Sequence, residues 1–217
     1  MNRLHVLELA IAIVVTFSTG CKNDGVSVDD RPVGLYAKVV DAGGGVVAGV
    51  NVHYIFYTST NAVVLNASIQ YSLPTPQVVT LKVFDPFDRE LTTLINAQQQ
   101  PAGSYMRFFD SSVTNGMYSF RLQANDSLLT VPFYIRDDDT ARLQMKPPLI
   151  TSDQSGAFFL SPSVLGIGRK FQGQFYAETI FDSISVVLVK ANYKTLVQGF
   201  GLDTTTPIDK IFTLEPN

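Results

Sequence analysis

Tryptophan is absent from the chain, and cysteine, histidine and charged residues are scarce. The 217 residues include one cysteine, two histidines and only 16% charged side chains. The single cysteine, Cys21, excludes a disulfide bond within the chain. A structural zinc site needs four ligands, mostly Cys and His, and His5, Cys21 and His53 are too few. We therefore predict that the protein holds no metal ion and no cofactor.

His53 is the only histidine that could serve a Ser-His-Asp triad, because His5 falls in the N-terminal leader described below. No Gly-x-Ser-x-Gly motif accompanies it in the sequence. His53 stands between Val52 and Tyr54, on the face of an expected strand opposite to the apolar residues. We therefore predict a solvated strand residue and not a catalytic base.

Three aspartates, Asp85, Asp88 and Asp110, lie at the ends of expected strands. Aspartate is favoured in turns because its carboxylate accepts hydrogen bonds from nearby backbone N–H groups. We assign these residues to turns, with acid–base catalysis by loop carboxylates as the alternative. The prediction is that the protein is not an enzyme.

The overall composition favours a folded, weakly acidic protein. Hydrophobic residues make up 46% of the chain, which is enough for a packed core. The formal net charge is −3, and no cluster of basic residues is present. Both features argue against a nucleic-acid partner.

The N-terminus has the pattern of a secretory signal peptide, which we place at residues 1–20. Arg3 gives a basic start, an apolar run covers residues 9–17, and Ser-Thr-Gly precedes Cys21. The run is too short to span a bilayer as a helix. The arrangement resembles a bacterial lipoprotein signal, which implies lipid attachment at Cys21; the alternative is an incidental cysteine. Residues 21–33 are then predicted to be a flexible, Asp-rich tether.

Residues 62–136 alternate apolar and polar side chains, which is typical of half-buried antiparallel strands. Turn-forming pairs such as Asp85-Pro86 and Asn115-Gly116 separate the runs. Short strands at this spacing predict a β-sandwich. Its expected core consists of Ile69, Tyr71, Leu73, Val79, Leu81, Val83, Leu91, Tyr118, Phe120 and Leu122.

This stretch resembles the Ig-like module of flagellar hook-capping (FlgD-like) proteins and the similar C-terminal sorting domains of type IX secretion. The matching blocks are IQYSLP at 69–74, VTLKVFD at 79–85, RELTTL at 89–94, PAGSY at 101–105 and GMYSFRL at 116–122. Because residues 137–217 follow it, we expect an internal module and not a terminal sorting signal.

Residues 34–57 also alternate, around a glycine-rich turn at 41–45 that we predict to be a hairpin turn. A phosphate-binding loop would need a following Gly-Lys-Ser/Thr and a helix, and neither is present. Later in the chain, residues 153–156 predict a turn, and residues 186–189 form an apolar run expected to be buried on both faces.

Together, residues 34–57 and 142–217 resemble the carboxypeptidase regulatory-like domain, which is a transthyretin-like sandwich. The matches are VVDAGG at 39–44, GVNV at 49–52, the segment 151–160, NY at 192–193 and TLEP at 213–216. The sequence thus predicts an all-β protein of two antiparallel β-sandwiches, with residues 62–136 inserted between strands of the other sandwich.

Asp137, Asp138 and Asp139 form the densest acidic run. Calcium binds six to eight oxygens, but an EF-type loop spaces its acids alternately, and this run does not. We predict a solvated linker turn, with calcium binding as the alternative.

The resemblances imply a non-enzymatic lipoprotein, exported to the bacterial cell envelope and most simply held at the outer membrane by its acyl chains. Its sandwiches are expected to contact envelope or surface proteins. The alternative is a glycan-binding lipoprotein, since the regulatory-like fold resembles carbohydrate-binding domains. Outward-facing aromatic residues such as Tyr176 and Tyr193 would then stack on sugars.

Overall fold

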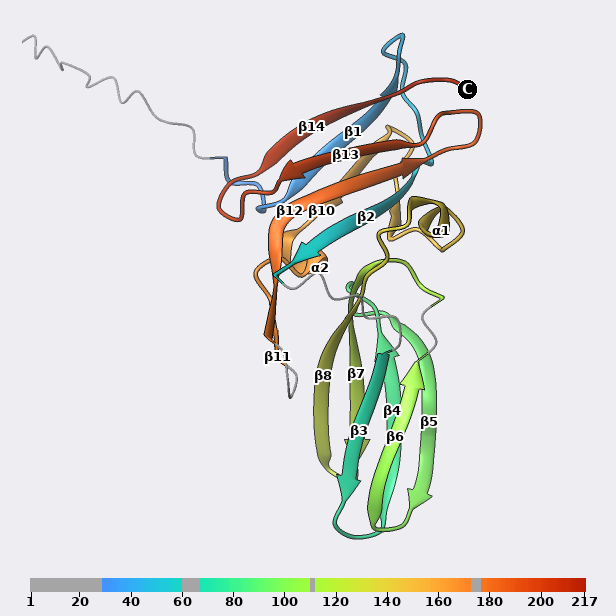
Figure 1. Ribbon diagram of the computed structural model, residues 1–217, viewed down its shortest axis with the longest axis vertical. Helices are drawn as coiled ribbons and strands as arrows, with labels where there is room; N and C mark the ends of the chain where they lie inside the picture. The colour runs from blue at the N-terminus through green and yellow to red at the C-terminus, as the bar shows by residue number, and fades with distance from the viewer. Residues whose placement is uncertain (1–28, 60–66, 110–111, 173–176) are drawn as a thin grey trace, which may run out of the picture. The chain divides into compact units, whose positions relative to one another are not determined.

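The computed structural model describes residues 29–59, 67–109, 112–172 and 177–217 (Figure 1). Its secondary structure is almost entirely β-strand, as the sequence predicts. Residues 31–217 form one compact unit. The predicted signal peptide and Cys21 lie outside the described residues. Within the described part of the chain, no helix has the length and hydropathy needed to cross a membrane.

The first set of strands, which we call the split sandwich, comes from both ends of the described chain. One sheet has the order β10-β1-β14, and the other has the order β11-β12-β2-β9, with β13 also paired to β12. Buried residues of the two sheets share one hydrophobic core. The strands are β1 (Leu35–Asp41), β2 (Asn51–Thr58), β9 (Ile150–Thr151), β10 (Ala157–Leu160), β11 (Lys170–Gln172), β12 (Ala177–Val189), β13 (Leu196–Gly201) and β14 (Ile208–Leu214).

Two short helices accompany these strands, α1 (Thr140–Gln144) and α2 (Pro162–Leu165). Leu143 of α1 is fully buried and packs with Ile55 and Val187, on the face of the β2–β12 pair away from the main core. This second small core explains the apolar run of β12. Val186 and Leu188 enter the main core, while Val187 enters the small one. The predicted burial of this strand on both faces is confirmed.

The glycine-rich turn closes a short antiparallel bridge between Val40 and Val46, but the predicted hairpin does not extend to a pairing of β1 with β2. Asp41 accepts hydrogen bonds from the N–H groups of Gly43 and Gly45, and the chain turns there. Strand β1, however, pairs with β10 on one edge and with β14 on the other. Because both edges of β1 are occupied, β2 joins the opposite sheet. The β1–β14 pair is parallel, within sheets that are otherwise antiparallel.

The second set of strands, which we call the inserted sandwich, comes from the middle of the chain. A two-stranded sheet, β3-β6, packs on a four-stranded sheet of order β5-β4-β7-β8 (Figure 1). The strands are β3 (Ala67–Leu73), β4 (Gln77–Phe84), β5 (Glu90–Gln100), β6 (Gly103–Phe109), β7 (Gly116–Ala124) and β8 (Ser127–Ile135).

The predicted core of the inserted sandwich is buried with one exception. Leu91 is 42% exposed, whereas the other nine predicted residues are at most 8% exposed. The β4–β5 pairing shifts register at several points, as β-bulges do. Each bulge inserts an unpaired residue and interrupts the strict alternation of faces, so Leu91 points outward.

Residues 31–33, the last residues of the predicted tether, belong to the folded unit. The guanidinium of Arg31 donates to both carboxylate oxygens of Asp209, at 2.9 and 2.7 Å. It also lies 4.4 Å from the centre of the Tyr36 ring, and the Tyr36 hydroxyl donates to the carbonyl of Pro32. Residues 31–33 are therefore held against the split sandwich.

Candidate functional site

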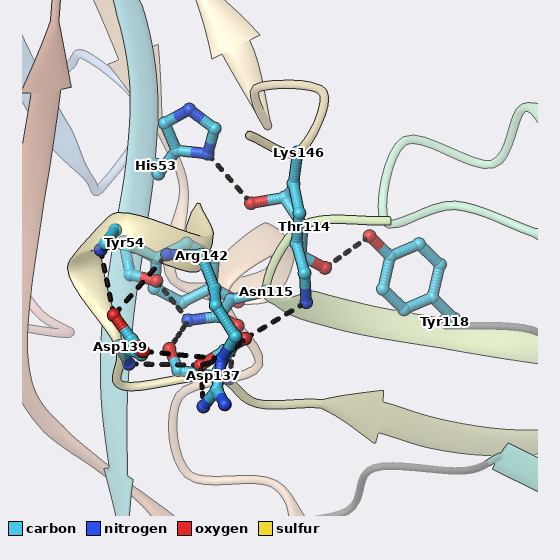
Figure 2. A network of polar contacts seen from close by, with 10 residues as sticks. His53, Tyr54, Thr114, Asn115, Tyr118, Asp137, Asp139, Arg142 and Lys146 are labelled. Atoms are coloured by element: carbon cyan, nitrogen blue, oxygen red, sulfur yellow. Dashed lines mark hydrogen bonds and ion pairs between the residues drawn. The ribbon is translucent and has the colours of Figure 1, made fainter. Parts of the chain in front are cut away.

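The two sandwiches are joined by a network of buried hydrogen bonds centred on Asn115 (Figure 2). The Asn115 amide nitrogen donates to the carbonyl of Tyr54 on β2, at 2.6 Å, and to the carbonyl of Asp137, at 2.7 Å. Its side-chain oxygen accepts from the backbone N–H of Asp137. Asn115 is fully buried, so one side chain satisfies three backbone groups that water does not reach.

His53 belongs to this network, and the prediction of a solvated His53 is wrong. The side chain is 1% exposed, and its Nδ1 lies 3.0 Å from the hydroxyl of Thr114. The Tyr118 hydroxyl in turn donates to the carbonyl of Thr114 (Figure 2). Both faces of β2 are covered, one by the main core and one by α1 and Thr114. Burial lowers the pKa of His53 and so favours the neutral ring.

The prediction of a solvated turn is wrong for Asp137, whereas Asp138 and Asp139 are exposed as predicted. Asp137 is 4% exposed, and it accepts hydrogen bonds from the guanidinium of Arg142, with Lys146 3.4 Å away. Burial alone would raise the pKa of Asp137, but the hydrogen bonds from Arg142 and from the backbone N–H of Asp139, together with the charge of Lys146, lower it.

The carboxylates of Asp138 and Asp139 have other partners. Asp139 is the N-cap of α1 and accepts from the backbone N–H groups of Ala141 and Arg142. Asp138 is exposed and lies 3.8 Å from the side chain of Arg136. In the described ranges no group of three or more His, Cys, Asp or Glu side chains is placed to hold a metal ion. The run therefore acts as a cap and an ion-pair cluster at the start of α1.

Of the aspartates predicted to lie in turns, Asp85 and Asp88 are not part of the junction network. Asp85 accepts hydrogen bonds from the backbone N–H groups of Phe87 and Arg89, as expected for a turn. Asp88 has a positive φ of 65° and an ion pair with Arg121. Asp110 lies outside the described residues.

A groove of about 600 Å³ crosses the outer face of the β10-β1-β14 sheet. Tyr36 and Phe159 line it, with their ring centres 4.7 Å apart, and charges of both signs surround them. Arg31 covers the ring of Tyr36, and the ring of Phe159 lies against Gly34 so closely that a Cβ there would be 2.6 Å away. Both rings are thus already in contact with protein groups.

The sequence suggested Tyr176 and Tyr193 as residues that would stack on sugars. Tyr193 is half-buried and packs against the main core of the split sandwich. Tyr176 lies outside the described residues.

The outer face of the β3–β6 sheet is the most distinctive exposed surface. Its outward residues pair across the two strands as Ser68 with Phe108, Gln70 with Met106, and Ser72 with Ser104. All six are exposed and none is charged. Phe108 is 63% exposed and Met106 is 41% exposed. We call these six residues the uncharged face.

A depression of about 400 Å³ adjoins the uncharged face along β3. It lies between the β3 edge and β8, and is lined by Gln70, Ser72, Leu122, Leu128 and Leu129 among others. Leu128 is 67% exposed and Leu129 is 49% exposed. The residues around the depression are also uncharged.

Neither the junction network nor the uncharged face was predicted from the sequence. The signal for the face was present, because residues 103–109 carry large apolar side chains at both even and odd positions. A half-buried strand with a solvated outer face does not need Met106 and Phe108. The signal for the junction was the Asn115-Gly116 pair, which also suits an ordinary turn.

Comparison of the chain with known protein families, with curated proteins and with solved structures found no match. The geometry of the junction and of the uncharged face is therefore the basis for any functional conclusion.

Proposed function

We propose that this is a non-enzymatic, lipid-anchored protein of the bacterial cell envelope that contacts other envelope proteins through the uncharged face of its inserted sandwich. The observation that carries the proposal is the exposure of Met106 and Phe108 on a six-residue face without charge. The centres of protein–protein interfaces are depleted of charged residues and enriched in aromatic residues and methionine.

The groove of the split sandwich supports the glycan alternative less well. A sugar-binding platform needs an aromatic ring with a free face. Arg31 already covers the ring of Tyr36, and Phe159 lies against both Tyr36 and Gly34. We therefore place recognition on the inserted sandwich and propose partner proteins as the ligands.

The junction network suits a role in presenting this face. Asn115, Thr114 and Asp137 link the inserted sandwich to β2 and α1 by buried hydrogen bonds. Buried polar networks that are well satisfied rigidify a structure. The split sandwich would then serve as the base that carries the binding module.

The contact surface can be tested by site-specific photo-crosslinking of the full chain in its own envelope. A photo-reactive residue at position 108 should give discrete crosslinked species, and Met106→Asp should abolish them. The matched control is a photo-reactive residue at Ile211, which is 70% exposed in the other sandwich. Discrete species from position 211 and none from position 108 would move the binding site to the groove and overturn the proposal.

The lipid anchor is tested separately, by palmitate labelling of the wild type and of Cys21→Ser. The proposal predicts labelling of the wild type alone. Equal labelling of both proteins, or no labelling of the wild type, would remove the lipoprotein part of the proposal.

A further inference from the structure

Strand β3 is an open sheet edge without the usual protection. Within the described chain it pairs with β6 alone, and its other edge borders the depression beside β8. Natural proteins guard exposed edges with charged residues, proline or bulges, because unpaired N–H and C=O groups invite another strand. The residues of β3 are Ala-Ser-Ile-Gln-Tyr-Ser-Leu, and its register with β6 is unbroken.

The other sheet edges of the inserted sandwich differ in this respect. Strand β8 contains Pro132, which has no N–H to donate, and β5 begins with Glu90 and carries several register shifts. Strand β6, which pairs with β3 alone among the described strands, carries the charged residue Arg107. In the split sandwich, the edge strand β14 carries Asp209 and Lys210. Strand β3 therefore combines an open edge with a sequence that contains no charged residue and no proline to prevent pairing.

The sequence of β3 is also symmetric about its central residue. Gln70 has three residues on each side, and the residue types match outward: Ile69 with Tyr71, Ser68 with Ser72, and Ala67 with Leu73. The first and third pairs are buried apolar residues, and the second pair is exposed serines. If a two-fold axis at Gln70 paired β3 with β3 of a second copy, each residue would therefore oppose a residue of the same type, apolar against apolar and serine against serine.

We propose that β3 pairs antiparallel with β3 of a second copy of this chain, around a two-fold axis at Gln70. The pairing places Ser68 opposite Ser72 of the second copy and Gln70 opposite Gln70 of the second copy. No like charges meet, and apolar residues oppose apolar residues on the core side. Closed homodimers with such self-complementary interfaces are the commonest oligomers.

The dimer would join two β3–β6 sheets into one four-stranded sheet. The two uncharged faces would then be continuous, which doubles the surface that carries Met106 and Phe108. This inference does not depend on the proposed function, because a self-pairing edge can exist whether or not the uncharged face binds a partner.

Cysteine crosslinking of the full chain tests the register directly. Opposed residues of an antiparallel pair have Cα atoms about 4.5–5.5 Å apart, within the range that a disulfide spans. Gln70→Cys should therefore form a covalent dimer on mild oxidation, whereas Ser68→Cys alone should not. Residue 68 of each copy lies four residues from its counterpart, roughly 13 Å along the strand.

Two further variants and the wild type test the proposed register and the role of Gln70. The double variant Ser68→Cys/Ser72→Cys should crosslink again, because the axis brings these two positions together. The wild type shows any crosslinking through Cys21, the only native cysteine. Gln70→Lys should abolish the non-covalent dimer in sedimentation, because like charges would meet at the axis. Because Gln70 is exposed, the variant should melt at the temperature of the wild type at protein concentrations low enough for both to be monomeric.

The outcomes separate the alternatives. Crosslinking of Gln70→Cys and of the double variant, but not of Ser68→Cys, supports the β3 pair. Crosslinking of Met106→Cys in preference to Gln70→Cys would assign the contact to β6 and overturn the inference. A monomer that gives no crosslink beyond the wild-type level in any variant would also overturn it, and the contacts proposed for Phe108 would still stand or fall on their own test.

Discussion

At the scale of single residues, Asn115 and His53 show how the junction depends on polar side chains with few substitutes. Asn115 offers a donor and an acceptor to three buried backbone groups at once. An apolar residue would fill the space but leave the carbonyl of Tyr54 and both backbone groups of Asp137 without partners. Unsatisfied buried groups cost more than the net gain of an ordinary hydrogen bond.

We expect Asn115→Ala to lower the free energy of unfolding by at least about 3 kcal/mol, because it strands three buried backbone groups and each costs about 1–3 kcal/mol. Denaturant unfolding measures the change. The control is Gln99→Ala, since Gln99 is an exposed amide on β5 and its loss should be nearly neutral. Equal, small effects of the two substitutions would show that the junction bonds contribute little.

His53 makes stability depend on pH. Its pKa in the folded protein is lowered from the usual 6.5 by burial, so near and below pH 6.5 the unfolded chain binds a proton that the folded chain does not. Protonation therefore favours unfolding, and stability falls as pH drops below about 6.5. Asp137 adds nothing in this window, because its pKa lies below 3.8 and its contribution is lost only at lower pH.

The measurement is the free energy of unfolding from pH 7.5 to pH 5 for the wild type and for His53→Gln. The wild type should lose stability as pH falls, while the variant should show a flatter profile, whatever its absolute stability. Parallel profiles would mean that His53 is not responsible for the pH dependence.

At the scale of elements, α1 shows how a short helix exists because of its surroundings. Five residues are too few for a stable isolated helix. The Asp139 cap satisfies two free N–H groups at its start, and Arg142 and Lys146 bind Asp137 just before it. Leu143 completes the small core on the second face of the β2–β12 pair. The helix therefore covers apolar residues of β2 and β12 and shields them from water.

Leu143→Ala should cost about 2–5 kcal/mol of stability, as expected for a fully buried leucine. Met145→Ala, two residues away, is the matched control, because Met145 is 79% exposed and should change stability little. Thermal and denaturant unfolding report both. A neutral Leu143→Ala would indicate that the small core does not hold α1 on the sheet.

At the scale of the whole molecule, the two sandwiches have separate cores and a shared boundary. Leu81 belongs wholly to the core of the inserted sandwich, and Leu188 belongs to that of the split sandwich. Strand β8 contributes to both cores. Ile135 lies in the core of the inserted sandwich, and Tyr134 lies in the core of the split sandwich, with its ring centre 5.6 Å from that of Phe56. The junction bonds and β8 are the routes by which the sandwiches can be coupled.

We predict that Leu81→Ala costs roughly 2–5 kcal/mol in the inserted sandwich and leaves the split sandwich folded. Amide exchange should lose protection in β4 and β7 and keep it in β1 and β12. Leu188→Ala serves as the reciprocal control and should reverse this pattern. Equal loss of protection in both regions would show one cooperative unit and would place no folding boundary between the sandwiches.

The periodicity of apolar residues predicted most of the strands and nine of the ten core residues proposed for the inserted sandwich. The prediction succeeded because a strand with one solvated face must alternate, and the alternation is local. Leu91 failed because bulges in its partner pairing change the face, and a bulge is a property of two strands together. The same limit applies to the strand before the glycine-rich turn. The strands that pair with β1 lie more than 100 residues further along the chain.

By itself, the sequence determined the all-β class, the strand positions and the apolar faces, because these follow from nearest neighbours along one chain. Only the tertiary structure decided that His53 and Asp137 are buried, that Asn115 bridges two sandwiches, and that β3 pairs with β6 alone among the described strands. Each of these depends on which distant segment covers a side chain or pairs with a strand. Long-range burial and pairing are collective, so no local pattern of residues encodes them.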